Sequence, residues 1–91
     1  MACFIITYDA ATDESNQKIL DVIQQYQNRA QISDRAWAVV TDGEATDIRD
    51  KLNLIISPED RFFVIKSGAQ AGWTNVICEK SWLHKYLMNE Y

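Results

Sequence analysis

The residue with the clearest chemical potential is Asp9, which follows an apolar run in the stretch FIITYDA at residues 4–10. Apolar residues occupy both alternating sets of positions in this run, whereas a strand with one wet face would alternate apolar and polar residues. The run therefore predicts a strand that is covered on both faces and has a carboxylate at its end. The alternative is that Asp9 caps or turns the loop that follows, as aspartate commonly does.

Four other side chains could contact a nucleic acid or a substrate. Tyr8 could stack on a base or position a substrate, although a tyrosine at a strand end is commonly a core residue with its hydroxyl in water. Arg29, Arg35 and Lys66 could form a local phosphate-contacting patch, although scattered basic side chains are commonly just solvated. The sequence leaves both interpretations open.

The chain contains one histidine, His84, and two cysteines, Cys3 and Cys78. Their spacing gives neither a zinc signature nor a disulfide framework. We interpret the cysteines as small apolar residues in a reducing compartment. We interpret His84 as structural, because no Ser or Cys nucleophile pattern accompanies it.

Composition and charge limit the class of protein. The 91 residues suit a single domain over residues 1–91, and 47% hydrophobic with 24% charged residues is typical of a folded domain. No apolar run approaches the roughly 18 residues of a membrane span, and the N-terminus lacks the basic start of a signal peptide. We therefore expect a cytoplasmic protein without a membrane partner. The net charge of −4 disfavours broad nucleic-acid binding, because Lys and Arg must neutralise phosphates.

The hydrophobic pattern predicts the order strand, helix, strand, strand, helix, strand and a tail. The strands are expected at residues 2–8, 29–33, 36–41 and 61–67, and the helices near 14–27 and 43–56. In the tail we expect a loop, a short edge strand at TNVIC (74–78) and a terminal helix over 79–91. This order is typical of an α+β, ferredoxin-like βαββαβ sandwich, with helices on one face of an antiparallel sheet.

The other face of this sheet also needs a cover, because three of the predicted strands are apolar on both sides. A second copy of the chain could supply it, and we prefer a symmetric homodimer because two-fold homo-oligomers are the commonest kind. The alternative is that Trp73 and the terminal helix cover that face within one monomer.

Several short pieces in chain order resemble a known family. They are FIITYDA (4–10), AWAVVTD (36–42), IRDKL (48–52), EDRFFVIK (59–66) and SWLHKYL (81–87), with the R-x-Q-x-S pattern at Arg29, Gln31 and Ser33. Together they resemble the second CRISPR-associated protein, the small adaptation-complex subunit of nuclease type, and still more its stand-alone SinR-like relatives. The resemblance covers nearly the whole chain and depends on the order of the pieces.

The resemblance implies a dimer in which Asp9 of each copy lies near the two-fold axis, where two carboxylates can hold a divalent metal. Mg²⁺, or Mn²⁺ in its place, suits such a site, because Mg²⁺ usually takes one or two carboxylates together with phosphate oxygens and waters. Asp9 would then be both metal ligand and catalytic residue. The chain departs from the pattern in its acidity and at Asp34–Arg35, which replaces an apolar continuation.

Two functions therefore stay open. The first is a metal-dependent endonuclease that cuts RNA or DNA as a dimer, with Asp9 at the metal and Tyr8, Arg29 and Arg35 as nucleic-acid contacts. The second is a non-catalytic dimeric module that binds a protein, a nucleic acid or a nucleotide. The acidity and the lack of a second catalytic residue favour the module, whereas the Tyr8–Asp9 placement favours the nuclease, towards which the sequence leans slightly.

Overall fold

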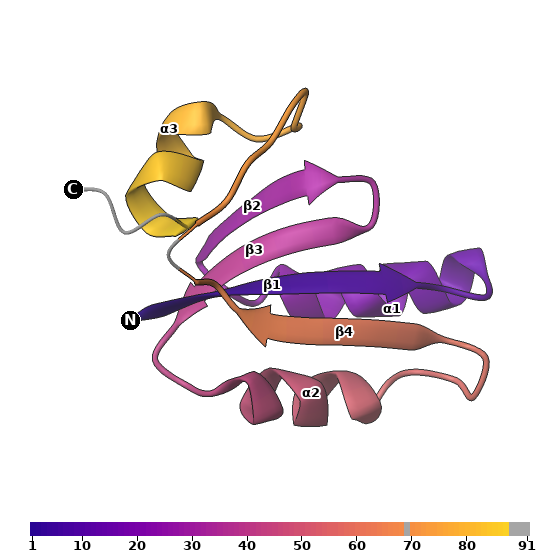
Figure 1. Cartoon of the computed structure of the whole chain (residues 1–91). Helices are drawn as coiled ribbons and strands as arrows, with labels where there is room; N and C mark the ends of the chain where they lie inside the picture. Colours follow the sequence, from indigo (N-terminus) through magenta and orange to yellow (C-terminus); the bar gives the residue numbers. More distant parts are fainter. Residues whose placement is uncertain (69, 88–91) are drawn as a thin grey trace.

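The computed structural model describes residues 1–68 and 70–87, and Figure 1 shows their arrangement. Its strands are β1 (Ala2–Asp9), β2 (Asn28–Ser33), β3 (Ala36–Thr41) and β4 (Arg61–Lys66). Its helices are α1 (Asp13–Ile23), α2 (Ala45–Asn53) and the short α3 (Lys80–Trp82), which continues into a π-helical segment, η1 (Leu83–Leu87).

The four strands form one antiparallel sheet in the order β2-β3-β1-β4. In the central pairs, Ile6 of β1 lies opposite Trp37 of β3 and Thr7 lies opposite Phe63 of β4. The sheet order and the βαββαβ sequence of elements are those of the ferredoxin-like fold, so the predicted fold class is confirmed.

Helix α1 starts within one residue and α2 within two residues of the expected position, and both end earlier than expected. The Thr12 hydroxyl accepts a hydrogen bond from the Ser15 N–H at 3.0 Å and caps α1, and a capping box joins Glu44 and Asp47 at the start of α2. After Ile23 the backbone tightens to bonds between residues three apart, such as Tyr26 N–H to the Ile23 carbonyl at 3.1 Å. Within the described residues no helix has the length and apolar character needed to cross a membrane.

The main core lies between the sheet and the two long helices. The side chains of β1 that point to the helices are Phe4, Ile6 and Tyr8, all less than 5% exposed. They pack against the apolar inner faces of the helices. The buried helix-side residues of this core are Ile19, Val22, Ile23, Tyr26, Ile48 and Leu52.

The C-terminal segment covers part of the other sheet face (Figure 1). Leu83 and Leu87 are buried there against Cys3 of β1 and Ala38 of β3. The indole Nε1–H of Trp82 donates to the Asn28 side-chain oxygen at 2.9 Å, which attaches the segment to β2. The sequence left open the alternative that the chain covers this face itself. The structure shows that it does so over the β1–β3 side of the sheet.

The expected edge strand at residues 74–78 is wrong. Asn75 adopts a left-handed backbone conformation with φ of 56°, which interrupts an extended run, although Ile77 N–H still donates to the Ile32 carbonyl of β2 at 3.0 Å. The terminal helix is confirmed over residues 80–87. Its expected continuation over 88–91 lies outside the described residues.

The described part of this segment leaves the β4 side of the sheet largely exposed. Phe63 is 60% exposed and Ile65 is 50% exposed, although both lie in the middle of a strand. On the helix side of the same strand, Phe62 and Val64 pack against the main core. An edge strand with apolar side chains on both faces is therefore accessible in a single chain.

Candidate functional site

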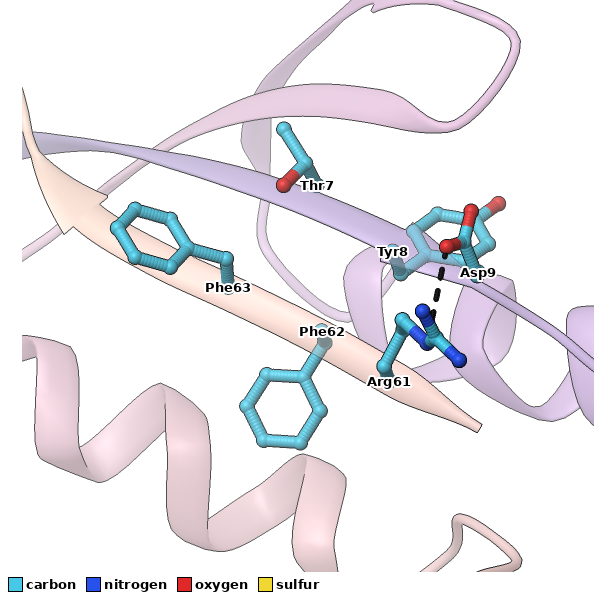
Figure 2. A pocket seen from close by; sticks show the side chains of 6 residues that line it. All are labelled: Thr7, Tyr8, Asp9, Arg61, Phe62 and Phe63. Carbon is cyan, nitrogen blue, oxygen red and sulfur yellow. Dashed lines mark ion pairs between the residues drawn. The ribbon is translucent and has the colours of Figure 1, made fainter. Parts of the chain in front are cut away.

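Asp9 is the last residue of β1 and lies on the sheet face opposite the helices, beside the open strand β4. The register places it opposite Arg61, and Arg61 Nε lies 3.9 Å from Asp9 Oδ2, as Figure 2 shows. Both side chains are mostly exposed, at 68% for Asp9 and 79% for Arg61. An ion pair this open to water stabilises the fold little.

The side chains around Asp9 form a shallow hollow of about 220 Å³. Figure 2 shows its walls, which come from the end of β1 and the start of β4. The lining residues are Thr7, Tyr8, Asp9, Arg61, Phe62 and Phe63. The hollow combines one carboxylate, one guanidinium, a hydroxyl and an exposed aromatic ring, which suits binding of a polar group better than proton transfer.

Tyr8 points the other way, because successive residues of a strand face opposite sides of the sheet. It is 4% exposed, and its hydroxyl is buried without a hydrogen-bond partner among the described residues. Burial raises the pKa of this phenol, and the nearby positive charge of Arg35 opposes that rise. A base cannot reach this ring while the helices are in place, so neither a stacking role nor a hydroxyl in water fits its position.

The two arginines proposed as nucleic-acid contacts lie at opposite ends of the sheet. Arg35, in the turn between β2 and β3, donates from Nη1 to the Ala10 carbonyl at 3.4 Å and so lies near Asp9. Arg29 shares a row with Val39, Phe4 and Lys66. Asp9 is five positions after Phe4 in β1, so the row of residues that contains Arg29 and Phe4 lies about 17 Å from Asp9 along the strands.

The predicted basic residues therefore do not form one patch. Arg29 donates from Nη1 to the Tyr26 carbonyl at 2.9 Å, which holds it at the end of α1. The arginine that does face Asp9 is Arg61, and sequence reasoning missed this role. Only the β1–β4 register brings residues 9 and 61 together.

Asp60 is a second residue that sequence reasoning missed. It is 8% exposed, and its carboxylate accepts hydrogen bonds from the N–H groups of Ala11 and Ser57, each at 2.8 Å. These two bonds hold the pKa of Asp60 below its ordinary value, with the Ala11 bond the larger cause. Asp60 thus joins the loop after β1 to the loop before β4, and fixes the end of β1 that carries Asp9.

The described residues of one chain do not form a metal centre. No group of three His, Cys, Asp or Glu side chains among them is arranged to hold an ion, and Asp9 already faces a guanidinium. Mg²⁺ normally needs one or two carboxylates together with other oxygen ligands. A metal site of the kind that the resemblance implies, with two carboxylates, would therefore need the Asp9 of a second chain.

Comparison with known proteins adds support for the fold. No family model matches the chain, and no curated protein matches it. Among solved structures it is similar to the crystal structure of a hypothetical protein, TT1823, from Thermus thermophilus, with a TM-score of 0.69 and 13% sequence identity. The similarity covers 82% of this chain and 92% of that one. At this identity the likeness shows a shared fold and no function.

The clamp at Asp60 gives a pH-dependent prediction. A carboxyl whose pKa is lower in the folded state stabilises the fold above its unfolded pKa, near 4, and loses that effect as pH falls through the folded value. Asp60→Asn should therefore lower the melting temperature by several degrees at pH 7 and flatten the decline of stability below pH 4. Thermal unfolding followed by circular dichroism at several pH values measures both effects.

The exposed neighbour supplies the control, since Glu59→Gln removes the same charge without touching either hydrogen bond. It should melt within about a degree of the wild type, as surface changes usually do. Equal melting of the two variants at pH 7 would mean that the Asp60 bonds do not hold the loops together.

Proposed function

We propose that this chain is a non-catalytic docking module that forms a homodimer. The surface through which the two copies bind is the open β4 side of the sheet. The observation that carries the proposal is the exposure of Phe63 and Ile65 in the middle of an edge strand. Large apolar side chains gathered at one place on a surface commonly mark a site of protein interaction. The unpaired backbone of the edge adds directional hydrogen bonds to that attraction.

The chemistry around Asp9 supports binding rather than catalysis. Its carboxylate faces Arg61, and the adjacent tyrosine is buried on the other side of the sheet. A general acid or base must lie within hydrogen-bond reach of the proton it transfers. Here the exposed polar groups are already paired with each other at the surface, which suits recognition.

Charge and thiol content are consistent with a protein partner in the cytoplasm. The net charge of −4 opposes contact with long stretches of phosphate. Cys3 and Cys78 are both free, and burial raises the pKa of each thiol. Unreactive free thiols suit a reducing compartment, where we place the protein.

The proposal predicts a dimer whose stability depends on Phe63. Light scattering coupled to gel filtration at micromolar concentration should give about twice the 10.5 kDa chain mass. Phe63→Lys should shift the population to monomer, because a charge cannot be buried in the interface without a partner. The fold of this variant should persist, since Phe63 is 60% exposed in a single chain.

Leu54→Lys is the matched control, since Leu54 is 85% exposed and follows α2, outside the strand β4. It should leave the dimer intact. A wild-type chain that is monomeric up to high micromolar concentration would overturn the homodimer.

A metal-dependent phosphodiesterase is the second candidate, and the exposure of Asp9 on the open face favours it. The resemblance to the nuclease-type adaptation subunit points to this residue. The activity would require Asp9 of two chains to meet at Mg²⁺ or Mn²⁺, with RNA or DNA as substrate. The ion would supply charge stabilisation and an activated water.

Cleavage assays separate the two candidates. As a docking module, the wild type should leave labelled single- and double-stranded RNA and DNA intact with Mg²⁺ or Mn²⁺. A metal-dependent activity that falls at least about 100-fold in Asp9→Asn would instead support the phosphodiesterase, since one transition-state contact can contribute this much. Asp34→Asn, an exposed change in the β2–β3 turn, is the control and should have no effect.

A further inference from the structure

We propose that two copies of this chain join edge to edge through β4, antiparallel, with Val64 of one copy opposite Val64 of the other. The two four-stranded sheets then form one continuous sheet of eight strands. This inference rests on the proposed function, and names both the partner and the register of the docking site.

The outward edge of β4 presents the backbone groups of Phe62, Val64 and Lys66. Ser67 N–H donates to the Cys3 carbonyl of β1 at 2.8 Å, so Ser67 faces inward. The hydrogen-bonding groups of successive residues in a strand point to opposite neighbours. The even-numbered residues of β4 therefore point away from β1, to a side where the described part of the chain has no strand.

This edge lacks the features that usually prevent pairing. Proline, a bulge or an inward-pointing charge commonly protects an exposed edge strand. The four central residues of β4, FFVI at 62–65, include none of these, and β4 pairs with β1 without a register shift. The charges Arg61 and Lys66 lie only at the two ends.

Symmetry restricts the registers that two copies can adopt. A two-fold axis perpendicular to the sheet keeps every side chain on its own face, so the numbers of opposed residues must add to an even number. The two central choices place either Phe63 or Val64 on the axis. With Phe63 on the axis, Arg61 lies opposite Ile65, so Ile65 gains no apolar partner across the edge.

With Val64 on the axis, the exposed apolar side chains of the open face match. Phe63 then lies opposite Ile65 twice, so the most exposed apolar residues of the strand cover each other, and aromatic with β-branched is a favourable cross-strand pair. Arg61 lies opposite Ser67, and the aliphatic stem of Lys66 covers Phe62. Because only this register pairs both Phe63 and Ile65 with an apolar side chain, it is the one we assign.

The surface on either side of the edge leaves room for the added strand. A hollow of about 250 Å³ lies between α2 and β4, and Ala45, Thr46, Arg49, Phe62, Phe63 and Val64 line it. The hollow at Asp9 lies on the other face of the same strand. Arg49 is already paired with Asp50 at 3.0 Å, so it brings no unbalanced charge to the interface.

The register fixes the distance between the two Asp9 residues. Each Asp9 lies beside the Arg61 of its own copy. In the assigned register the two Asp9 residues are offset by six residues along the strands. They are also offset by three strand spacings across the sheet, because the two β4 strands lie between the two β1 strands. These offsets place the two Asp9 Cα atoms about 25 Å apart. Two carboxylates at that distance cannot share one metal ion, so the edge dimer excludes a phosphodiesterase whose metal is shared by its two Asp9 residues.

Distance measurement between spin labels tests this geometry. The label goes on Asp9→Cys in a background with Cys3→Ala and Cys78→Ser, and circular dichroism confirms that the labelled chain folds. We expect a single inter-copy distance of about 25 Å, widened by the reach of the labels. Light scattering on the same sample reports whether the chain is dimeric.

The outcomes separate the two proposals. A dimer with labels closer than about 15 Å, which is too close for the assigned offset between strands, would overturn the edge register, leave the homodimer standing and favour a shared Asp9 site. A monomer would overturn both the register and the homodimer.

Disulfide trapping then tests the register itself. Because Phe63 and Ile65 of the second copy form a close, non-hydrogen-bonded pair in the assigned register, Phe63→Cys with Ile65→Cys in the same background should oxidise to a covalent dimer. Phe63→Cys alone should stay monomeric on a non-reducing gel. Rapid cross-linking of the single variant would place Phe63 on the axis and overturn the assignment.

Discussion

A sheet with apolar side chains on both faces must be covered on both faces, and most of this structure follows from that constraint. The helices α1 and α2 cover one face, where Ile6, Ile19 and Leu52 are fully buried. The described part of the C-terminal segment covers the other face over β1, β2 and β3. Phe63 and Ile65 of β4 stay largely exposed on that face, and the docking proposal concerns these two side chains.

The sequence predicts the fold well because its signals are local. Short runs that are apolar on both alternating sets of positions define the strands, and the apolar residues Ile19 and Val22 lie at the helical spacing that defines the inner face of α1. The signals fail where longer-range geometry decides. The strand expected at 74–78 does not form because the chain passes through a left-handed residue, Asn75, and no pattern in the sequence requires that conformation.

The candidate site was predictable only in part for the same reason. The position of Asp9 at the end of β1 follows from the apolar run before it, and so does its placement on the face opposite Tyr8. Its pairing with Arg61, which lies 52 residues further along the chain, depends on the register between β1 and β4. The clamp from Asp60 to Ala11 spans 49 residues and has no local signature at Ala11.

Amide hydrogen exchange measured by NMR tests the central claim most directly, because it reads the outward backbone bonds of β4 one by one. If β4 pairs with a second copy, the N–H groups of Phe62 and Val64 should exchange slowly, and faster on dilution as the dimer dissociates. In a lone chain these two groups face water while the inward N–H groups of Phe63 and Ile65 stay protected by β1. Rapid exchange at Phe62 and Val64 in a sample shown to be dimeric would contradict docking through this edge.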